Sequence, residues 1–222
     1  MSAPTPPVLT LDGSAIDAVV AVLVDAFRDY PVMRFVLGPD NPRYDDELRR
    51  LVRFFVMARV ERGETILGIA GESGSAETAG KAGMTGASPS LSAVALVSYP
   101  GRRSGTPALD AARSELWKAL GSGPRERYQA FSEAAGGFDV GVPHVHLNMI
   151  GVHGSARGAG LGGRLMDAVH DVSARDAGSR GVTLTTEDPR NVPFYERYGY
   201  EVVGHVRVSP ELETWGFFRE DA

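Results

Sequence analysis

Apolar side chains recur at helical spacing in the first third of the chain, a pattern that predicts two core helices. The first would carry five apolar side chains on one face: Ile16, Val19, Val20, Leu23 and Phe27. Ser14 and Asp17 are typical of a capping box at its start, and Pro31 is expected to end it. A second helix is predicted from about Tyr44 to Arg62, where Gly63 stops it.

Short β-rich runs and an inserted helical pair are predicted around these helices. Strands are expected at three places: Val8–Leu11, Thr65–Ala70 and Leu91–Tyr99. Gly, Ala, Ser and Thr dominate from Ser73 to Ser90, so a mobile loop is expected there. Two further helices are expected at Pro107–Leu120 and Arg125–Ala135, separated by the breaker residues from Gly121 to Pro124. This pair would form a helical insertion before the next strand.

From His144 onward the pattern predicts a strand, a Gly-rich turn, a helix, a strand, a short helix and two paired strands. Side chains alternate between apolar and other types from Val145 to Val152, the period of a half-buried strand. The turn from His153 to Ala159 leads into a helix that begins near Leu161. The later elements are expected at Val182–Thr186, Val192–Tyr198, Tyr200–Val208 and Glu213–Phe218. With no internal repeat in view, one domain over residues 1–222 is expected.

The Gly-rich turn has the features of a phosphate site. Its residues are Arg157, Gly158, Ala159, Gly160, Leu161 and Gly162. Glycines without Cβ atoms let the backbone approach a ligand closely. The first N–H groups of the following helix have no intrahelical acceptor and lie at the positive end of its dipole. The turn therefore predicts phosphate binding; a loop whose glycines only permit tight packing is the alternative.

A dinucleotide-binding fold is a second interpretation of the same turn. Gly158, Gly160 and Gly163 satisfy a GxGxxG pattern, and Glu187 follows a strand where such a fold has its ribose-binding acid. However, five residues separate Val152 from Gly158, whereas the dinucleotide turn begins as its strand ends. Only about a sixth of the chain follows Glu187, too little for the further βαβ units of a doubly wound sheet.

Composition excludes several classes of function. The chain has 23 Lys and Arg against 28 Asp and Glu, a net charge of −5 that disfavours a general nucleic-acid binder. It has no cysteine, which excludes thiol nucleophiles and thiolate metal sites, and no tight histidine–carboxylate cluster, so no metal is expected. Neither a signal peptide nor a membrane span is predicted, because the apolar run Ala18–Val24 is short and flanked by Asp17 and Asp25. We therefore expect a cytoplasmic protein.

Two motifs in this order resemble the coenzyme-binding core of the GNAT superfamily of N-acetyltransferases: R-x-x-G-x-G at residues 157–162, and NVPFYERYGY at residues 191–200. AFRDYP at residues 26–31 and DPRNVPFYER at residues 188–197 resemble the puromycin N-acetyltransferase group of bacterial small-molecule acetyltransferases. The resemblance implies acetyl-CoA as co-substrate and an α/β (α+β) fold of the GNAT type. Such a fold has a mixed central sheet, splayed at the coenzyme site and flanked by helices.

The resemblance also implies which residues bind the coenzyme. A stretch of strand backbone would pair with the pantetheine arm as an added strand: Ile150, Gly151 and Val152. The amides from Arg157 to Gly162 would hold the pyrophosphate, with the Arg157 side chain adding positive charge. Asn191 matches a position that often hydrogen-bonds the coenzyme; an N-cap for the short helix is its alternative role.

Acetyl transfer needs a neutral amine, a donor for the developing oxyanion and a proton for the departing thiolate. Because the chain has neither a cysteine nor a G-x-S-x-G elbow, direct attack by the amine in a ternary complex is the simpler hypothesis. The backbone N–H of Ile150 is a candidate oxyanion donor. Tyr195 matches the tyrosine near the coenzyme sulfur in many family members, so the resemblance implies a general acid there; a core aromatic is the alternative.

His146 is the predicted base. It falls at the strand position where several superfamily members carry a Glu or His, and an imidazole that titrates near neutrality suits proton removal from an ammonium. Residues 146–153 are similar to the corresponding strand of arylalkylamine N-acetyltransferases, which has a second histidine where this chain has Asn148. His144 and His153 are weaker candidates, and a structural histidine, with water or another group as the base, stays open.

The sequence thus favours an N-acetyltransferase that acts on a primary amine of a small molecule. A protein or peptide N-acetyltransferase, a catalytically degenerate acyl-CoA-binding domain and, less favoured, a dinucleotide enzyme are the alternatives. Phe27–Leu37 and Ser209–Trp215 are expected to shape the acceptor pocket, and their aromatic and apolar residues suit a small, partly apolar amine. No nucleic-acid or membrane partner is expected, and the strands near the C-terminus could pair in a homodimer.

Overall fold

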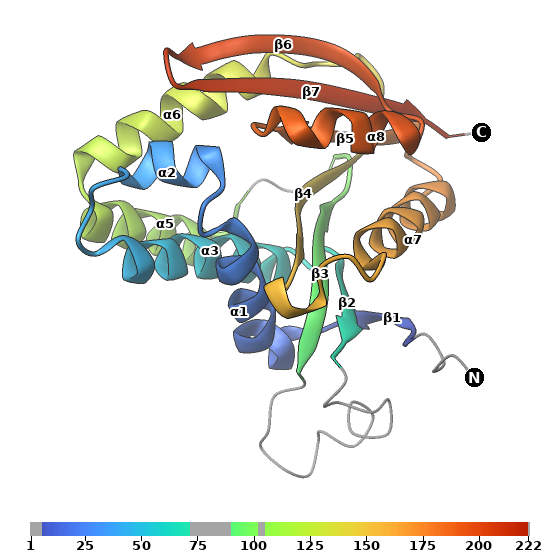
Figure 1. Ribbon diagram of the computed structural model, residues 1–222, viewed down its shortest axis with the longest axis horizontal. Coiled ribbons are helices and arrows are strands. Elements are labelled where there is room, and N and C mark those ends of the chain that lie inside the picture. Colours follow the sequence, from blue (N-terminus) through green and yellow to red (C-terminus); the bar gives the residue numbers. More distant parts are fainter. Residues whose placement is uncertain (1–5, 72–89, 102–104, 222) are drawn as a thin grey trace.

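A seven-stranded sheet with the strand order β1-β2-β3-β4-β5-β7-β6 organises the molecule. The computed structural model describes residues 6–71, 90–101 and 105–221. β4 and β5 are parallel, and every other neighbouring pair is antiparallel. This mixed sheet, covered by helices on both faces (Figure 1), has the predicted fold class. The predicted loop from Ser73 to Ser90 lies, apart from Ser90, outside the described residues.

The first strand and the N-terminal helices follow the predicted pattern, with two corrections. β1 spans Val8–Leu11, α1 Ile16–Phe27 and α3 Tyr44–Glu61. The cap at the start is Asp12, whose carboxylate accepts the N–H of Ser14 ahead of the short 3-10 turn Gly13–Ala15. Pro31 does not merely end a helix but occupies the first turn of another, α2 (Pro31–Leu37), where its missing N–H costs nothing.

The middle of the chain forms two strands and the predicted helical insertion. β2 spans Ile66–Ala70, β3 Leu91–Ser98, α5 Pro107–Leu120 and α6 Ser122–Gly136. The predicted break between the two helices is shorter than expected, because Gly121 alone, at a φ of 92°, turns the chain. Pro124 is then accommodated in the first turn of α6, where helices tolerate proline.

The C-terminal half carries the remaining predicted elements in the predicted order. They are β4 (Val145–Val152), the 3-10 turn η2 (Gly154–Ala156), α7 (Leu161–Arg175), β5 (Gly181–Thr186), η3 (Pro189–Asn191), α8 (Val192–Arg197), β6 (Glu201–Ser209) and β7 (Leu212–Glu220). Buried and half-buried side chains alternate strictly along β4, as the period of two predicts.

Two hydrophobic cores cover the two faces of the sheet. One lies beneath α1, α2 and α3 and includes Leu23, Leu51 and Leu96; the other lies beneath α7 and α8 and includes Leu165 and Phe217. Figure 1 shows α7 on the opposite side of β3 and β4 from α1 and α3. The sheet is thus fixed from both sides, and the parallel strands β4 and β5 end between the two helical layers.

A glycine pair attaches the helical insertion to the far edge of the sheet. Gly204 on β6 and Gly216 on β7 face each other in register, and an added Cβ at either one would overlap the ring of Phe138. The ring of Phe138, two residues after the end of α6, therefore lies against the backbone of both strands. This contact holds α6 beside β6 and β7.

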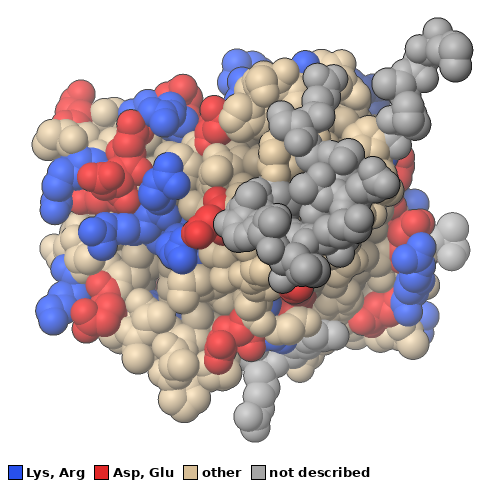
Figure 2. All heavy atoms as spheres, turned by 90° about the horizontal axis from the view of Figure 1, so that it is seen from below, with Lys and Arg blue, Asp and Glu red and all other residues tan. Residues whose placement is uncertain are grey.

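The surface is charged without an extended patch of one sign on the face in view. Basic and acidic side chains are interspersed there (Figure 2). Among the described residues no helix is long and apolar enough to cross a bilayer. Within the same part of the chain, no group of three or more His, Asp or Glu side chains could hold a metal ion.

Candidate active site

The parallel strands separate where the candidate site lies. β4 pairs with β5 only from Val145 to Leu147, whereas its pairing with β3 continues to Val152. The edge of β4 that faces β5 is therefore free of strand pairing from Asn148 onward, among the described residues. An unpaired strand edge presents N–H and C=O groups to an extended ligand. Ile150, Gly151 and Val152, predicted to bind pantetheine, lie on this free edge.

The Gly-rich turn lies directly beyond the end of β4. Gly158 and Gly160 have φ angles of 81° and 73°, and nothing lies within 4 Å of a Cβ built on either. The first hydrogen bond of α7 runs from the N–H of Arg164 to the carbonyl of Gly160. In the described part of the chain, the amides from Gly158 to Gly162 have no protein acceptor. The turn is thus an open cradle of N–H donors at a helix N-terminus.

An open groove of about 510 Å³ runs along the free edge of β4. Its lining includes Ile150, Gly151, Val152, Arg157, Asp188, Arg190 and Asn191, together with Asp25–Phe27, Asp29 and Tyr30. Asp25 accepts the N–H of Gly154 at 2.6 Å and so fixes the turn after β4. The side chain of Asn191 does not cap α8; its amide nitrogen donates to the Thr186 hydroxyl at 3.2 Å. Asn191 is thereby held at the wall of the groove.

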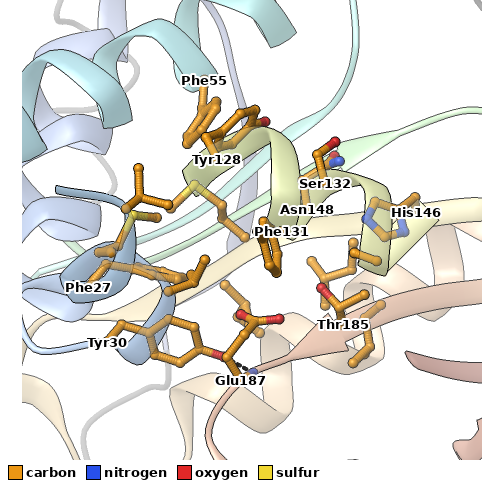
Figure 3. A pocket seen from close by; sticks show the side chains of 18 of the residues that line it. Phe27, Tyr30, Phe55, Tyr128, Phe131, Ser132, His146, Asn148, Thr185 and Glu187 are labelled. Carbon is orange, nitrogen blue, oxygen red and sulfur yellow. Dashed lines mark hydrogen bonds between the residues drawn. The ribbon is translucent and has the colours of Figure 1, made fainter. Parts of the chain in front are cut away.

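A second cavity, of about 410 Å³, lies along residues 146–150 of β4 and is mostly aromatic and apolar. We call it the aromatic cavity, after its five aromatic rings: Phe27, Tyr30, Phe55, Tyr128 and Phe131 (Figure 3). Tyr128 stacks on Phe55 at 6.0 Å and lies 5.2 Å from the ring of Trp117. The rings come from α1, the start of α2, α3 and α6, so the insertion forms one wall of the cavity.

The groove and the aromatic cavity meet at four shared lining residues: Phe27, Tyr30, Ile150 and Asn191. Tyr195 lines the cavity near this junction and is 6% exposed. Its ring packs on Phe217 and Tyr200, and within the described residues its hydroxyl has no hydrogen-bond partner. Burial, and to a lesser degree the charge of Glu187, raise the pKa of Tyr195, so the phenol carries its proton at any ordinary pH.

His146 lines another part of the aromatic cavity. Its Nδ1 lies 2.9 Å from the hydroxyl of Thr183 on the paired strand β5. Loss of hydration, with smaller contributions from His144 and Arg59, lowers the pKa of His146 to about 4. The imidazole is therefore neutral at neutral pH and able to accept a proton, but it holds that proton weakly.

A carboxylate that the sequence pointed to only as a ribose-binding acid also faces the cavity. Glu187 directly follows β5 and is 6% exposed, and its Oε1 accepts the hydroxyl of Thr214 at 2.8 Å. Its backbone N–H donates to the hydroxyl of Tyr30 at 3.1 Å (Figure 3). Burial raises the pKa of Glu187 to about 7, opposed by hydrogen bonds from Thr214, Thr185 and Tyr30.

The structure thus brings the predicted site residues into two adjoining spaces. Tyr195 and His146 lie in the aromatic cavity, the Gly-rich turn lies beyond the groove, and Asn191 lies between the two. Of the two segments expected to shape an acceptor pocket, residues 27–37 line the cavity but residues 209–215 do not. Leu212 faces the hydrophobic core instead, and Trp215 stacks on His205.

The part of the chain that forms the site is similar in sequence to known acetyltransferases. The acetyltransferase (GNAT) domain profile matches residues 129–213, which contain β4, the Gly-rich turn and α8. Blasticidin-S acetyltransferase of Streptomyces morookaense is 31% identical over 110 residues, which are 47% of this chain and 74% of that protein.

Solved structures with the same fold cover nearly the whole chain. The Corynebacterium glutamicum protein described as histone acetyltransferase HPA2 and related acetyltransferase has 21% identity and a TM-score of 0.64, over 98% of this chain and 97% of its own. The polyamine N-acetyltransferase of Drosophila melanogaster, which forms N-acetylagmatine, has 17% identity and a TM-score of 0.65, over 96% and 99%. From the curated relative, the domain match and this fold, the chain belongs to the GNAT family of acetyltransferases and is an acyltransferase.

Proposed function

We propose that this protein transfers the acetyl group of acetyl-CoA to the primary amine of a small, partly apolar molecule, by direct attack in a ternary complex. The observation that carries the proposal is the junction of an open groove and an aromatic cavity at the free edge of β4. One space suits an extended donor and the other suits a compact acceptor. The two would then meet beside Tyr195.

The groove fits the coenzyme, which supplies the acetyl group as a thioester. Ile150, Gly151 and Val152 would pair with its pantetheine arm through backbone groups. The unpartnered amides from Gly158 to Gly162 and the exposed guanidinium of Arg157 would hold the pyrophosphate. Asn191 would hydrogen-bond the arm between them, since Thr186 already fixes the direction of its side chain.

Tyr195 is the group we assign to protonation of the departing sulfur. Its hydroxyl carries a proton, has no competing acceptor among the described residues and lies in the cavity near the groove. The backbone N–H of Ile150 is the proposed oxyanion donor. His146 is neutral and faces the cavity, so the role of base stays a prediction for it.

The acceptor is proposed to be a small molecule because the cavity of about 410 Å³ has the size of a ligand pocket and is lined mainly by apolar and aromatic groups. The 31% identity to blasticidin-S acetyltransferase and the resemblance to the puromycin N-acetyltransferase group both favour an amine-bearing antibiotic or a similar compound. The net charge of −5 and the interspersed surface charges of Figure 2 give no support to a nucleic-acid partner.

Thiol release from acetyl-CoA, measured with a panel of amines, tests the proposal. The panel contains puromycin, blasticidin S, 2-phenylethylamine, agmatine and a peptide with a free N-terminus. We expect release with at least one of the small, partly apolar amines and none with the peptide. Acetyl-CoA binding without turnover of any amine would instead favour a degenerate acyl-CoA-binding domain, and turnover of the peptide alone would favour a protein acetyltransferase.

A further inference from the structure

Glu187 is a buried carboxylate without a cationic partner. Its side chain is 6% exposed, and no Lys, Arg or His among the described residues forms an ion pair with it. The neighbouring acid Asp188 differs, because Arg190 pairs with it at 2.6 Å. Burying a carboxylate is costly unless a cation or several donors compensate it. Hydrogen bonds from Thr214, Thr185 and Tyr30 compensate the buried charge only in part, because burial still raises the pKa of Glu187.

The two basic side chains in the described lining of the cavity, Arg59 and His146, do not balance the charge of Glu187. Arg59 also lines it, but its guanidinium is paired with Glu64 at 2.8 Å and is neutralised there. His146 is uncharged at neutral pH. Glu187 is therefore the one carboxylate among the described lining residues, and nothing in the lining balances its charge.

The groups packed against Glu187 leave its carboxyl group directed into the aromatic cavity. Tyr30, at the start of α2, accepts its backbone N–H, and Thr214 on β7 holds Oε1 from the side of the sheet. Tyr195 on α8 is close enough for the charge of Glu187 to raise its pKa. The titratable groups that face Glu187 are thus two protonated phenols. In Figure 3 the carboxyl group points into the cavity, on a different wall from His146.

On the basis of the proposed function, we infer that Glu187 binds the ammonium group of the acceptor and takes the proton that this group must lose before it attacks. The first proton passes from nitrogen to the Glu187 carboxylate, which frees the nitrogen lone pair. The C–N bond then forms and the C–S bond breaks. Tyr195 gives its O–H proton to sulfur and regains one from the nitrogen. The proton on Glu187 leaves to solvent, so one amide, one thiol and one proton are the net products.

The same arrangement specifies a class of acceptor. A primary ammonium satisfies Glu187, and an apolar or aromatic body fills the space between Phe27, Phe55 and Phe131. A second ammonium on the body would have no carboxylate to meet in the described lining. Monocationic amines should therefore be better acceptors than polyamines or agmatine.

The test uses two acceptors of the same shape but different charge. 2-Phenylethylamine is a cation at neutral pH, whereas its isostere O-benzylhydroxylamine is neutral. Glu187→Gln should lower kcat/KM for 2-phenylethylamine by about 10²-fold or more, the usual scale of a positioned base, and for O-benzylhydroxylamine by less than about tenfold. A structural role would lower both equally and would overturn the inference. If His146→Gln, and not Glu187→Gln, lowers kcat/KM far more for 2-phenylethylamine than for O-benzylhydroxylamine, then His146 is the base. That result would also overturn the inference.

A binding measurement separates the inference from the proposed function. Titration calorimetry of 2-phenylethylamine into the CoA-saturated protein at pH 7, in two buffers of different ionisation heat, should detect release of about half a proton from the wild type and none from Glu187→Gln. Proton release without thiol release in any assay would overturn the proposed function and leave the ammonium site standing. Equal proton release by the two proteins would overturn the site.

Glu47→Gln controls for a general effect of removing a buried carboxylate. Glu47 is paired with Arg43 outside both spaces, so this variant should behave as wild type.

Discussion

Removing the hydroxyl of Tyr195 separates the packing role of its ring from a role in proton transfer. Its ring contacts Phe194, Tyr200 and Phe217, while its hydroxyl has no partner among the described residues. Tyr195→Phe should therefore leave the melting temperature and acetyl-CoA affinity near wild type, because no hydrogen bond is lost. If the hydroxyl protonates the sulfur, kcat should fall by about 10²-fold or more.

Tyr200→Phe is the matched control for that experiment. Tyr200 is equally buried, but its hydroxyl lies 3.1 Å from His170 and it lines neither the groove nor the cavity. Its loss should lower stability slightly and leave kcat unchanged. Wild-type turnover by Tyr195→Phe, measured with a true acceptor and with chemistry shown to be rate-limiting, would remove Tyr195 from the mechanism.

The candidate site could be predicted from the sequence only where a local pattern carries the information. The Gly-rich turn and Tyr195 stand in short motifs; Arg157 of the turn lines the groove, and Tyr195 lines the aromatic cavity. The local pattern around Glu187 indicates only a ribose-binding acid, although an acid directly after a buried strand is itself a signal. Glu187 lacks a cationic partner because its neighbours are Thr214 and Tyr30 and because Arg59 is paired with Glu64. These residues are distant in sequence, so no local pattern could reveal the unpaired charge.

At the scale of elements, the start of α7 makes a prediction about coenzyme binding. Gly160 is left-handed with a φ of 73°, so Gly160→Ala should cost about 1–2 kcal/mol of stability through backbone strain alone. Its new Cβ would also project into the open space where we place the pyrophosphate. The dissociation constant of acetyl-CoA, measured by calorimetry, should therefore rise as well.

Gly141→Ala provides the control, because Gly141 has a φ of 68° and equally open surroundings but lies outside both spaces. The two variants should lose similar stability, and only Gly160→Ala should bind acetyl-CoA more weakly. Equal affinity in both folded variants would contradict the cradle.

The seat of Phe138 on Gly204 and Gly216 makes a second prediction at this scale. Phe138→Ala removes the anchor between the end of α6 and the sheet, and α6 carries two of the five rings of the aromatic cavity. The KM for the acceptor should rise roughly threefold to tenfold, equivalent to about 1 kcal/mol of lost positioning, while the acetyl-CoA dissociation constant stays unchanged. Phe138→Leu should be intermediate, and a change in acetyl-CoA affinity alone would contradict this role.

The elements themselves were mostly predictable, and the exceptions have physical causes. Periodicity located α1, α3, β4 and α7 because each has one buried face, and the breaker residues after Leu120 gave the end of α5. It did not locate α2, which follows α1 after a short turn and uses Pro31 as a start rather than a stop. The early start of α6 was also missed, because proline and glycine in a first turn look like breakers when the cap is unknown. Strand order was beyond reach, since pairing depends on partners distant in sequence.

At the scale of the whole molecule, Glu187 makes the stability depend on pH. The shift of its pKa from 4.5 to about 7 means that the folded state binds this proton more tightly than the unfolded chain. The stabilisation is complete below pH 4.5 and is lost as the pH rises through 7, a change on the order of 3 kcal/mol. Glutamine does not titrate, so the Glu187→Gln variant lacks this pH-dependent loss of stability. The melting temperature of the variant minus that of the wild type should therefore increase between pH 5 and pH 8.

Comparing the two proteins at each pH is essential, because His146 and His170 change the stability in the opposite direction. Both have a pKa lowered to about 4, so the stability associated with their neutral rings is lost as the pH falls below 6.5. The histidines are common to the variant and the wild type and cancel in the difference. If the difference in melting temperature stays constant from pH 5 to pH 8, the pKa of Glu187 is not raised in the folded protein.

The wall formed by α6 has a consequence for how this enzyme can change over generations. No residue of α6 is fully buried, although the helix borders the aromatic cavity and is fastened by the Arg127 guanidinium to the carbonyl of Val36 at 2.9 Å. Close packing therefore constrains substitutions along its inner side less than it constrains those on α1, α3 and α7. A lineage could exchange one amine for another through a few replacements on this helix and inherit its donor recognition intact. Acceptor preference should accordingly diverge faster among descendants than the Gly-rich turn does.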